Sequence, residues 1–556
     1  MRSIAPHFNQ CLSDSIREFW EMPALSDYGI NTLQYKDVAR NIEKWHIFFE
    51  KAGIKKGDKI ALCGRNQSHW GVAFFAILTY GAVAVPILHE FHPNQVHDIV
   101  NHSESRMLFV GDLVWKKLDP KEMPALLAVI SNKDDSLLFS ASKIITETHE
   151  HLNELFGQKY PKKFLPQNLH YHADTPDELC IINYTSGTTS NSKGVMIPYR
   201  AIWSNMMFAY EVFGTHAKAG DAILSMLPMA HTYGMSFEFI YEFTAGVHVN
   251  FLTKMPTPAI LLKALADVRP AVLIVVPLIL EKIVKKAVLP KVQDPIIGRL
   301  MKTPIVGKVI KRKICEGIRE AFGGRFYEVI VGGSAMNQEI EELLHDIGFN
   351  YTIGYGATEC APILAYEDWH SFVPGSCGKA APRMELKIDS PDPHRIPGEI
   401  LARGMNVMLG YYKNEEATRE TLRDGWYHTG DLGVIDRDGN VFIKGRSKNM
   451  LLGANGQNIY PEEIEDRLSS LPMVAECVVI QHGEKIYGLV YPDMEACEKQ
   501  GMTHEAISDL MEDNRKKLNA SLPAYEQLAG IKIMDKEFEK TPKKSIKRFL
   551  YMNEEV

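Results

Sequence analysis

Short apolar runs alternate with amphipathic helical patterns along most of this chain. Apolar runs at residues 59–63 and 106–110 border helical patterns, one of which covers residues 70–78. Farther along, an apolar run at residues 272–276 follows a helical pattern at residues 259–266. Strands that alternate with helices form parallel βαβ units, so the pattern predicts an α/β fold.

The pattern restarts after a polar segment, Lys-Gly-Arg-Ser-Lys, at residues 444–448. A predicted helix at residues 461–470 and two predicted strands follow this segment. We therefore expect a large N-terminal domain of residues 1–447 and a smaller C-terminal domain of residues 448–556. About one hundred residues is a normal size for an autonomous unit.

Residues 71–88 carry no charge over a length close to that of a membrane-spanning helix. Gly81 and Pro86 interrupt this stretch, and both residue types disfavour a continuous helix. We predict instead a buried helix that ends at Leu78, a turn at Gly81 and a short strand at residues 82–85.

Composition narrows the class of protein. The 556 residues are 45% hydrophobic and 24% charged, which excludes a disordered, a collagen-like or a polytopic membrane chain. The net charge of −7 argues against nucleic acid as a partner of the whole molecule. The eight cysteines include no Cys-x-x-Cys pair, so we expect no zinc ribbon and no disulfide scaffold. They indicate reduced thiols in a cytoplasmic protein.

Two local clusters differ from the average composition of the chain. Residues 282–325 hold twelve Lys or Arg and three Asp or Glu, a local balance of +9. A solvated helix face is the commoner explanation of such a run, and contact with an anionic surface is the alternative. His89, His92, His97 and His102 also crowd together, but no spacing among them matches a zinc-binding helix.

The most informative segment is residues 184–194, Tyr-Thr-Ser-Gly-Thr-Thr-Ser-Asn-Ser-Lys-Gly, which follows a predicted strand at residues 179–182. A loop that is rich in N–H and O–H donors and carries one lysine suits a polyphosphate. It is not a Walker loop, because it contains no Gly-Lys pair after Gly187. On composition alone, a Ser/Thr-rich surface turn is the alternative.

Residues 185–194 resemble the phosphate-loop signature of the adenylate-forming superfamily, which includes acyl- and aryl-CoA ligases, luciferases and peptide-synthetase adenylation domains. Further signatures appear in the order of that family, at residues 227–234 (Leu-Pro-Met-Ala-His-Thr-Tyr-Gly), 332–335 (Gly-Gly-Ser-Ala), 354–359 (Gly-Tyr-Gly-Ala-Thr-Glu), 398–400, 427–431 (Tyr-His-Thr-Gly-Asp), 445–448 and 456–465. The resemblance runs from about residue 15 to about residue 548. The ordered set is far more specific than any single motif.

This resemblance implies an AMP-forming acid–thiol ligase, most similar to bacterial long-chain fatty acid–CoA ligases. In that family a carboxylate attacks the α-phosphorus of ATP, pyrophosphate leaves, and a thiol then displaces AMP from the acyl-adenylate. ATP, Mg²⁺ and coenzyme A are the implied cofactors. The implied fold is α/β: layered α/β subdomains with a β-barrel-like part, followed by a mobile C-terminal α+β domain.

The resemblance also implies roles for single residues. The β- and γ-phosphates would be held by Thr185, Ser186, Gly187, Thr188, Thr189 and Lys193. The adenine would be contacted by Tyr355, Gly356, Gly333, Ser334 and Ala335. Asp431 would accept both ribose hydroxyls, and Arg446 would bind near the ribose and phosphate. Thr358 would contact the α-phosphate, Glu359 would coordinate Mg²⁺, and His231 would flank the reacting carboxylate.

Two regions depart from the family pattern. The usual Gly-x-Pro-Lys is replaced by Ser-Asn-Ser-Lys at residues 190–193, so two serines replace a glycine and a proline. The family's C-terminal lysine, which stabilises the adenylation transition state, aligns with Ser545. We expect Lys544 to take its place, because a flexible ammonium side chain tolerates a one-residue shift. Lys543 and Lys547 are the alternatives.

Lys448 matches the hinge about which the last domain of this family rotates between half-reactions. Three features favour a fatty acid as substrate: the Tyr-Gly-Ala-Thr-Glu form at residues 355–359, the absence of a carrier-protein domain after the last motif, and Thr232. This threonine stands where activators of amino acids place an aspartate for the substrate amine.

The expected partners are a fatty acid and coenzyme A, without nucleic acid. Two alternatives stay open: a ligase that loads a carrier-protein thiol, and a binder of acyl-adenylate that catalyses one half-reaction or none. The basic segment at residues 282–325 is expected to meet an anionic surface, either membrane lipid or the phosphates of coenzyme A. Peripheral contact of a cytoplasmic protein with the inner membrane surface would follow from the first option. The sequence predicts no oligomeric state.

Overall fold

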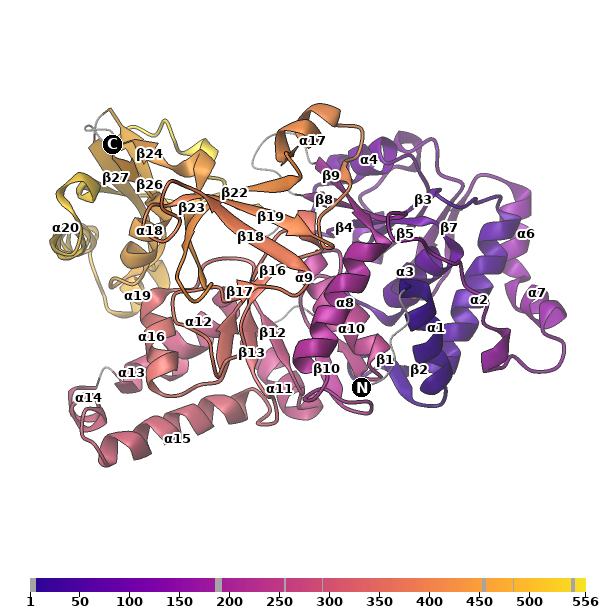
Figure 1. The fold of residues 1–556 in the computed structure, drawn as a ribbon, viewed down its shortest axis with the longest axis horizontal. Coiled ribbons are helices and arrows are strands. Elements are labelled where there is room, and N and C mark those ends of the chain that lie inside the picture. Colours follow the sequence, from indigo (N-terminus) through magenta and orange to yellow (C-terminus); the bar gives the residue numbers. More distant parts are fainter. Residues whose placement is uncertain are drawn as a thin grey trace.

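The computed structural model describes residues 7–185, 193–254, 257–292, 294–452, 457–483, 485–541 and 546–556. In Figure 1, layered α/β sheets extend from the right side to the lower left, an antiparallel barrel-like part lies in the upper middle, and a small C-terminal α+β unit lies at the upper left. Within the described ranges, no helix combines the length and the apolar character that a bilayer crossing requires.

The largest sheet has eight strands in the order β20-β9-β8-β4-β3-β5-β6-β7. Its strands are β3 (Lys59–Cys63), β4 (Val83–Ile87), β5 (Ser105–Val110), β6 (Ala128–Ser131), β7 (Leu137–Ser140), β8 (Leu179–Thr185), β9 (Lys193–Pro198) and β20 (Gly410–Tyr411). The five strands from β8 to β6 are parallel, which confirms the predicted βαβ units. At the edges, β7, β9 and β20 are antiparallel. The helices that pack on the sheet or on one another include α2 (Tyr35–Lys51), α3 (Ser68–Tyr80), α4 (Pro93–His102) and α8 (Tyr199–Phe213).

Two smaller sheets complete the layered part. One has the order β10-β11-β1-β2 and consists of β1 (Pro23–Asp27), β2 (Asn31–Gln34), β10 (Ala222–Ser225) and β11 (His248–Phe251). The other is fully parallel and consists of β12 (Leu273–Val275), β13 (Val329–Val331) and β14 (Tyr351–Ile353). The helices of this region are α11 (Pro258–Val268), α12 (Pro277–Ala287), α14 (Pro295–Met301), α15 (Val306–Ala321) and α16 (Gln338–Asp346).

The barrel-like part is antiparallel, with a five-stranded and a three-stranded sheet. Its strands are β15 (Tyr355–Gly356), β16 (Ile363–Tyr366), β17 (Lys379–Ala380), β18 (Met384–Asp389), β19 (Gly398–Gly404), β21 (Leu422–Arg423), β22 (Trp426–Ile435) and β23 (Val441–Arg446). The C-terminal unit contains β24 (Leu451–Leu452), β25 (Asn458–Ile459), α18 (Pro461–Ser469), β26 (Val474–His482), β27 (Lys485–Pro492), α20 (His504–Ala520) and β28 (Leu528–Ile533). A 3₁₀ turn, η5 (Ser447–Asn449), lies between β23 and β24.

The uncharged stretch at residues 71–88 folds as predicted. Helix α3 is apolar all round and buried, as expected for a helix in the core of a large protein. It ends at Gly81, whose positive φ of 86° is a left-handed conformation that glycine adopts without steric cost. Strand β4 then follows and is fully buried. The stretch is therefore core and not a membrane span.

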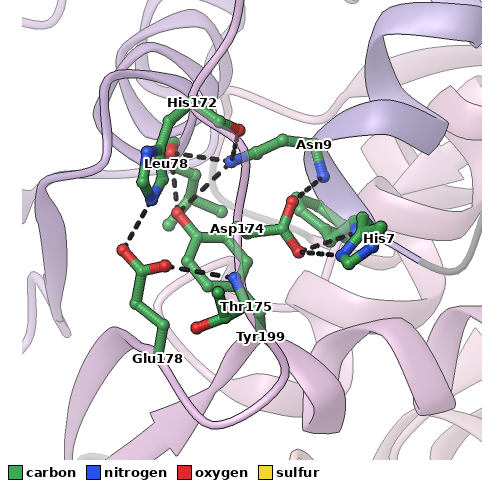
Figure 2. A network of polar contacts seen from close by, with 9 residues as sticks. His7, Asn9, Leu78, His172, Asp174, Thr175, Glu178 and Tyr199 are labelled. Carbon is green, nitrogen blue, oxygen red and sulfur yellow. Dashed lines mark hydrogen bonds and ion pairs between the residues drawn. The ribbon is translucent and has the colours of Figure 1, made fainter.

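A buried polar network fixes helix α1 (Phe8–Glu18) to the segment that leads into β8 (Figure 2). The Asp174 carboxylate accepts hydrogen bonds from the backbone N–H groups of Phe8 and Asn9, at 3.1 and 2.9 Å. The Asn9 amide donates in turn to the carbonyl oxygens of Leu78 and His172. A carboxylate at a helix N-terminus satisfies otherwise unpaired donors and complements the helix dipole. The network thereby holds the strand that carries the expected phosphate loop.

One buried carboxyl group gives the fold a pH dependence. Glu242 lies in α10 (Tyr241–Thr244), and its Oε2 has no hydrogen-bond partner among the described residues. Burial, with a smaller contribution from the charge of Asp221, raises the pKa of Glu242 from 4.5 to about 8. In the unfolded chain this group releases its proton at the ordinary pKa. Between these two values the folded protein binds the extra proton, so this group's contribution to stability falls as pH rises.

We predict that Glu242→Gln removes this contribution, because the amide keeps the shape of the side chain and cannot ionise. The stability of the variant relative to wild type should rise with pH between about 5 and 8, by at most about 1.4 kcal/mol per pH unit. Thermal unfolding at both pH values measures the difference. An equal difference at the two pH values would contradict the assignment.

Candidate active site

Polar and glycine-rich segments lie at the carboxyl ends of the parallel strands. Gly333, Ser334 and Ala335 follow β13 directly, and all three are exposed. Gly333 has a φ of 96°, which disfavours a side chain at this point of the turn. Ligands of open α/β sheets bind outside the carboxyl ends of parallel strands, so this exposed backbone strip is a candidate wall of a site.

Tyr233 connects this strip with the expected histidine. Its hydroxyl donates to the Ile330 carbonyl at 3.1 Å, and a Cβ at Gly332 would lie 3.0 Å from its ring. The Tyr233 backbone N–H donates to Nδ1 of His231 at 3.2 Å, at the start of α9 (Thr232–Met235). An imidazole that accepts at Nδ1 is neutral and carries its proton on Nε2. His231 is half-buried, and its neighbour Tyr233 contacts the segment that leads into the glycine strip.

Asn66 fixes the loop that leads to His231. Its amide nitrogen donates to the Leu227 carbonyl at 2.6 Å and to Ser225 Oγ at 3.2 Å, while its Oδ1 accepts from the Met229 N–H at 2.9 Å. Asn66 comes from the turn before α3, about 160 residues away in sequence. Sequence reasoning missed this residue, since a single Asn in a turn carries no local signal.

Glu238 supports the same loop from the other side. It lies in a π-helical turn, η3 (Ser236–Ile240), and is fully buried. Its Oε2 accepts from the N–H groups of Met226 and Leu227, at 2.9 and 2.8 Å, and from Ser225 Oγ at 3.3 Å. Burial raises the pKa of Glu238 well above its ordinary value, and the hydrogen bonds from Leu227, Met226 and Ser225 oppose this shift. Its only sequence signal is a carboxylate inside an apolar run, which the motif search did not weigh.

Asp431 and Tyr355 form a buried pair, and the more exposed Arg446 contacts Asp431 from the surface. Asp431 is 5% exposed. Its Oδ2 accepts from the Tyr355 hydroxyl at 2.5 Å, and its Oδ1 pairs with Arg446 Nε at 2.7 Å. Burial raises the pKa of Asp431, and the Arg446 charge opposes this shift. A carboxylate has about four lone-pair positions, so two acceptor positions are left for the hydroxyls of a ribose.

Glu359 and Lys193 meet at a residue that the motifs did not include, Tyr411. The Tyr411 hydroxyl donates to Glu359 Oε1 at 2.9 Å. Lys193 Nζ lies 4.8 Å from the centroid of the Tyr411 ring, a cation–π arrangement. Strand β20 positions Tyr411 by pairing with β9, the strand that begins at Lys193. The pair Tyr411-Tyr412 after Gly410 was the available sequence signal.

The backbone on the N-terminal side of Glu359 is tightly packed. Thr358 is 5% exposed and begins the 3₁₀ turn η4 (Thr358–Cys360). Gly356 is exposed, but a Cβ there would lie 2.6 Å from the Pro362 carbonyl oxygen. No larger residue fits without backbone movement. The turn therefore brings Tyr355, Thr358 and Glu359 together in a fixed order.

The Glu359 carboxylate fits the oxygen chemistry of Mg²⁺. Tyr411 occupies one oxygen, and among the described residues no side chain binds Oε2 of Glu359. The described ranges contain no group of three or more His, Cys, Asp or Glu side chains that could hold a metal ion. Mg²⁺ that is bound by one carboxylate together with substrate phosphates and water needs no such group.

The phosphate loop is described only at its two ends. Thr185 ends β8 and pairs with Lys193 at the start of β9, so part of the segment expected as a loop is strand. Ser186, Gly187, Thr188 and Thr189 lie outside the described residues, as does Lys544. The crowded histidines lie near this hairpin but have separate partners. For example, His102 Nδ1 is 2.6 Å from the Tyr184 hydroxyl.

At the domain boundary, Lys448 is exposed within η5. The first turn of α18 packs on the end of β23: Lys444 Nζ donates to Glu463 Oε1 at 2.8 Å, and a Cβ at Gly445 would lie 2.7 Å from Glu462 Oε2. A second contact joins Asn337 to the Ser470 hydroxyl at 2.7 Å. The C-terminal unit is thus docked by a few polar contacts.

Together, the layered sheets, the half-barrel and the small C-terminal domain define the adenylate-forming fold. The profile described as AMP-binding enzyme matches residues 12–412, and the profile described as AMP-binding enzyme C-terminal domain matches residues 448–554. This chain belongs to the AMP-binding enzyme family.

Similar proteins share most of the chain. The long-chain-fatty-acid–CoA ligase FadD15 of Mycobacterium bovis is 26% identical over 539 residues, which cover 89% of this chain and 86% of that protein. Long chain acyl-CoA synthetase 1 of Arabidopsis thaliana is 27% identical over 563 residues, covering 91% and 83%. The structure of the anthranilate CoA ligase AuaEII with anthranoyl-AMP has a TM-score of 0.78 at 19% identity and covers 99% and 97% of the two chains. ATP-bound MatB from Rhodopseudomonas palustris has a TM-score of 0.74 at 20% identity, covering 97% and 99%. Both structures share the fold.

We predict that Glu238→Ala destabilises the protein, because it leaves the buried N–H groups of Met226 and Leu227 without an acceptor. Each unpaired buried group costs about 1–3 kcal/mol, so a loss of at least about 2 kcal/mol in the free energy of unfolding is expected. Glu238→Gln is the matched control and should stay within about 1 kcal/mol of wild type, since its amide oxygen still accepts. Urea unfolding measures the free energy of unfolding of both variants. Equal effects of the two substitutions would contradict the role of this side chain.

Proposed function

We propose that this chain activates a medium- or long-chain fatty acid with ATP and transfers the acyl group to coenzyme A. The observation that carries the proposal is the buried Asp431 carboxylate, which binds Tyr355 and pairs with the more exposed Arg446, in a member of the AMP-binding enzyme family. Relatives named long-chain-fatty-acid–CoA ligase and long chain acyl-CoA synthetase support the substrate class.

In this proposal, Asp431 accepts the ribose hydroxyls with its remaining lone pairs, and Arg446 binds near the ribose and phosphate. The exposed strip of Gly333, Ser334 and Ala335 borders the adenine, with Tyr355 and Gly356 on its other side. Thr185, Lys193 and the segment between them hold the β- and γ-phosphates. Glu359 would hold Mg²⁺, which offsets negative charge on the phosphate oxygens when it is bound.

The chemistry proceeds in two steps. A carboxylate oxygen of the fatty acid attacks the α-phosphorus of ATP, and pyrophosphate leaves; His231 and Thr358 flank the reacting groups. The thiol of coenzyme A then attacks the carbonyl carbon, and AMP leaves with the bridging oxygen. We propose that residues 448–556 rotate about Lys448 between these steps relative to residues 1–447. The few polar contacts that dock α18 support a movable domain.

The surroundings of Thr232 favour a substrate acid that has no amino group. It is 1% exposed, and within the described residues its hydroxyl has no hydrogen-bond partner. A bound ammonium would need an acceptor, and a desolvated cation without a counter-charge is costly. A threonine at this position therefore does not favour an amino acid.

The proposed location is the cytoplasm. All eight cysteines are buried and free, which is typical of a protein in a reducing compartment. Peripheral contact with a membrane surface is part of the proposal.

We predict that fatty acids support ATP–pyrophosphate exchange without coenzyme A, and that Glu359→Ala lowers the exchange rate by about 10²-fold or more through lost placement of charge at the phosphates. Glu416→Ala, an exposed carboxylate in α17 (Glu415–Thr421), is the control and should behave as wild type. A panel of fatty, aromatic and amino acids, with and without coenzyme A, gives the measurement. Exchange with an aromatic or amino acid but with no fatty acid would overturn the substrate class.

We also predict that Lys544 supplies the cation of the adenylation step. Lys547 is held within its own domain, because its Nζ donates to Glu539 at 3.2 Å. Lys543→Ala and Lys547→Ala are therefore the matched controls. Lys544→Ala should slow adenylation while thioester formation from pre-made acyl-adenylate stays near wild type. If Lys544→Ala keeps adenylation within about threefold of wild type, less than about 1 kcal/mol of barrier, this assignment fails.

A further inference from the structure

Helices α14 and α15 form a corner that exposes large apolar side chains. Seventeen large apolar side chains are exposed among the described residues, and five of them lie between residues 296 and 309: Ile296, Leu300, Ile305, Val306 and Val309. Ile296 is 70% exposed and Ile305 is 80% exposed. Apolar side chains that gather in one exposed patch mark an interaction site more often than single ones do. We call residues 295–313 the α14–α15 corner.

These apolar side chains are not needed for the packing of the helices. The buried face of α15 carries Gly307, Cys315 and Ile318, and it faces the core between α11 and the β12–β14 sheet. Ile305 and Val309 lie one turn apart on the opposite side. In Figure 1 the corner lies at the outer rim of the molecule, with α14 at its end and α15 along the edge.

Basic side chains surround the apolar ones. Arg299, Lys302, Lys308, Arg312 and Lys313 are all exposed on the corner. Arg312 lies 3.5 Å from Glu316, whereas the other four form no ion pair with any residue that the structure describes.

Other cations of the basic segment at residues 282–325 are used inside the protein. Lys311 pairs with Asp346 at 2.6 Å, and Arg325 pairs with Asp221. Arg319 lies over the Phe326 ring. Lys282 and Lys285 on α12 are also exposed, but five of the exposed cations of the segment lie on the corner that exposes the apolar side chains.

We propose that the α14–α15 corner docks on an anionic lipid bilayer. Ile296, Ile305 and Val309 enter the boundary between headgroups and acyl chains, and the surrounding cations contact lipid phosphates. Apolar side chains together with Lys and Arg on one exposed helical face are the combination that interfacial binding uses. Each basic residue near an anionic leaflet adds to binding, and the attraction weakens with salt.

Two other occupants fit the corner less well. A symmetric contact with a second copy would place the same patch on both sides, so Lys302, Lys308 and Lys313 would face like charges. The phosphates of coenzyme A would satisfy the charges, but small ligands bind in concave sites, whereas this corner is a projecting pair of helices. The proposal stands on this surface alone and does not depend on the proposed activity.

The test is flotation of the full-length protein with phosphatidylcholine vesicles, with and without phosphatidylglycerol. Wild type should float with the mixed vesicles at low salt, and much less with the neutral ones. Ile305→Glu/Val309→Glu should lower the partition coefficient at least about tenfold, because two carboxylates cannot enter the bilayer boundary. Its matched control is Ile30→Glu/Ile144→Glu, which changes two exposed apolar side chains elsewhere, 72% and 65% exposed.

A second pair of variants tests the charges. One variant carries four changes to Gln on the corner, at Arg299, Lys302, Lys308 and Lys313, and its partition coefficient should also fall at least about tenfold. The control carries four changes to Gln elsewhere, at Lys55, Lys56, Lys116 and Lys117. The control alters the net charge equally and should keep the partition coefficient of wild type. Unchanged melting temperatures show that the variants fold. The proposal is overturned if wild type floats equally with both vesicle types, or if the corner variants float like their controls. A wild-type dimer that the corner variants dissociate, seen by light scattering, would assign the corner to self-association instead.

Discussion

The pairing of one buried carboxylate with an arginine and a tyrosine holds the candidate site together. Asp431 comes from β22, Tyr355 from β15 and Arg446 from the end of β23, so the contacts join the two antiparallel sheets of the half-barrel next to the start of the C-terminal unit. A buried charge is costly unless it is paired and hydrogen-bonded, so these three segments are stable only in this arrangement.

The candidate site also depends on a rigid loop before His231. Its backbone polar groups are buried, and they are satisfied by Asn66 and Glu238 from two different elements. The glycine strip after β13 is different, because its backbone is exposed and available to a ligand. Tyr233 connects the two parts by its bond to the Ile330 carbonyl. Rigid support next to open backbone is what a site needs to bind a polar ligand in one orientation.

Much of the fold could be predicted from apolar periodicity. The runs that become β3, β5 and β12 are buried strands, and Gly81 ends α3 because its backbone is left-handed. The antiparallel strands β9 and β20 were not predicted. They pair residues more than 200 positions apart, and β20 is only two residues long, too short to show a period.

The residues of the candidate site also divide into those that sequence motifs indicate and those that only the tertiary structure identifies. Ordered motifs located Asp431, Tyr355, Glu359 and His231, since each lies in a run of unusual composition. Asn66, Glu238 and Tyr411 could not be found in this way, because their roles depend on partners that only the tertiary structure supplies. Charge counting found the basic segment, but it could not separate the cations paired inside the protein from those at the α14–α15 corner.

The central claim is that the carboxylate of a fatty acid becomes bonded to the α-phosphorus of ATP at this site. A fatty acid with both carboxylate oxygens labelled with ¹⁸O tests this directly when it is turned over with ATP and coenzyme A. The account predicts one labelled oxygen in the AMP that is released, and none in pyrophosphate. A label in inorganic phosphate with formation of ADP, or AMP without label, would contradict it.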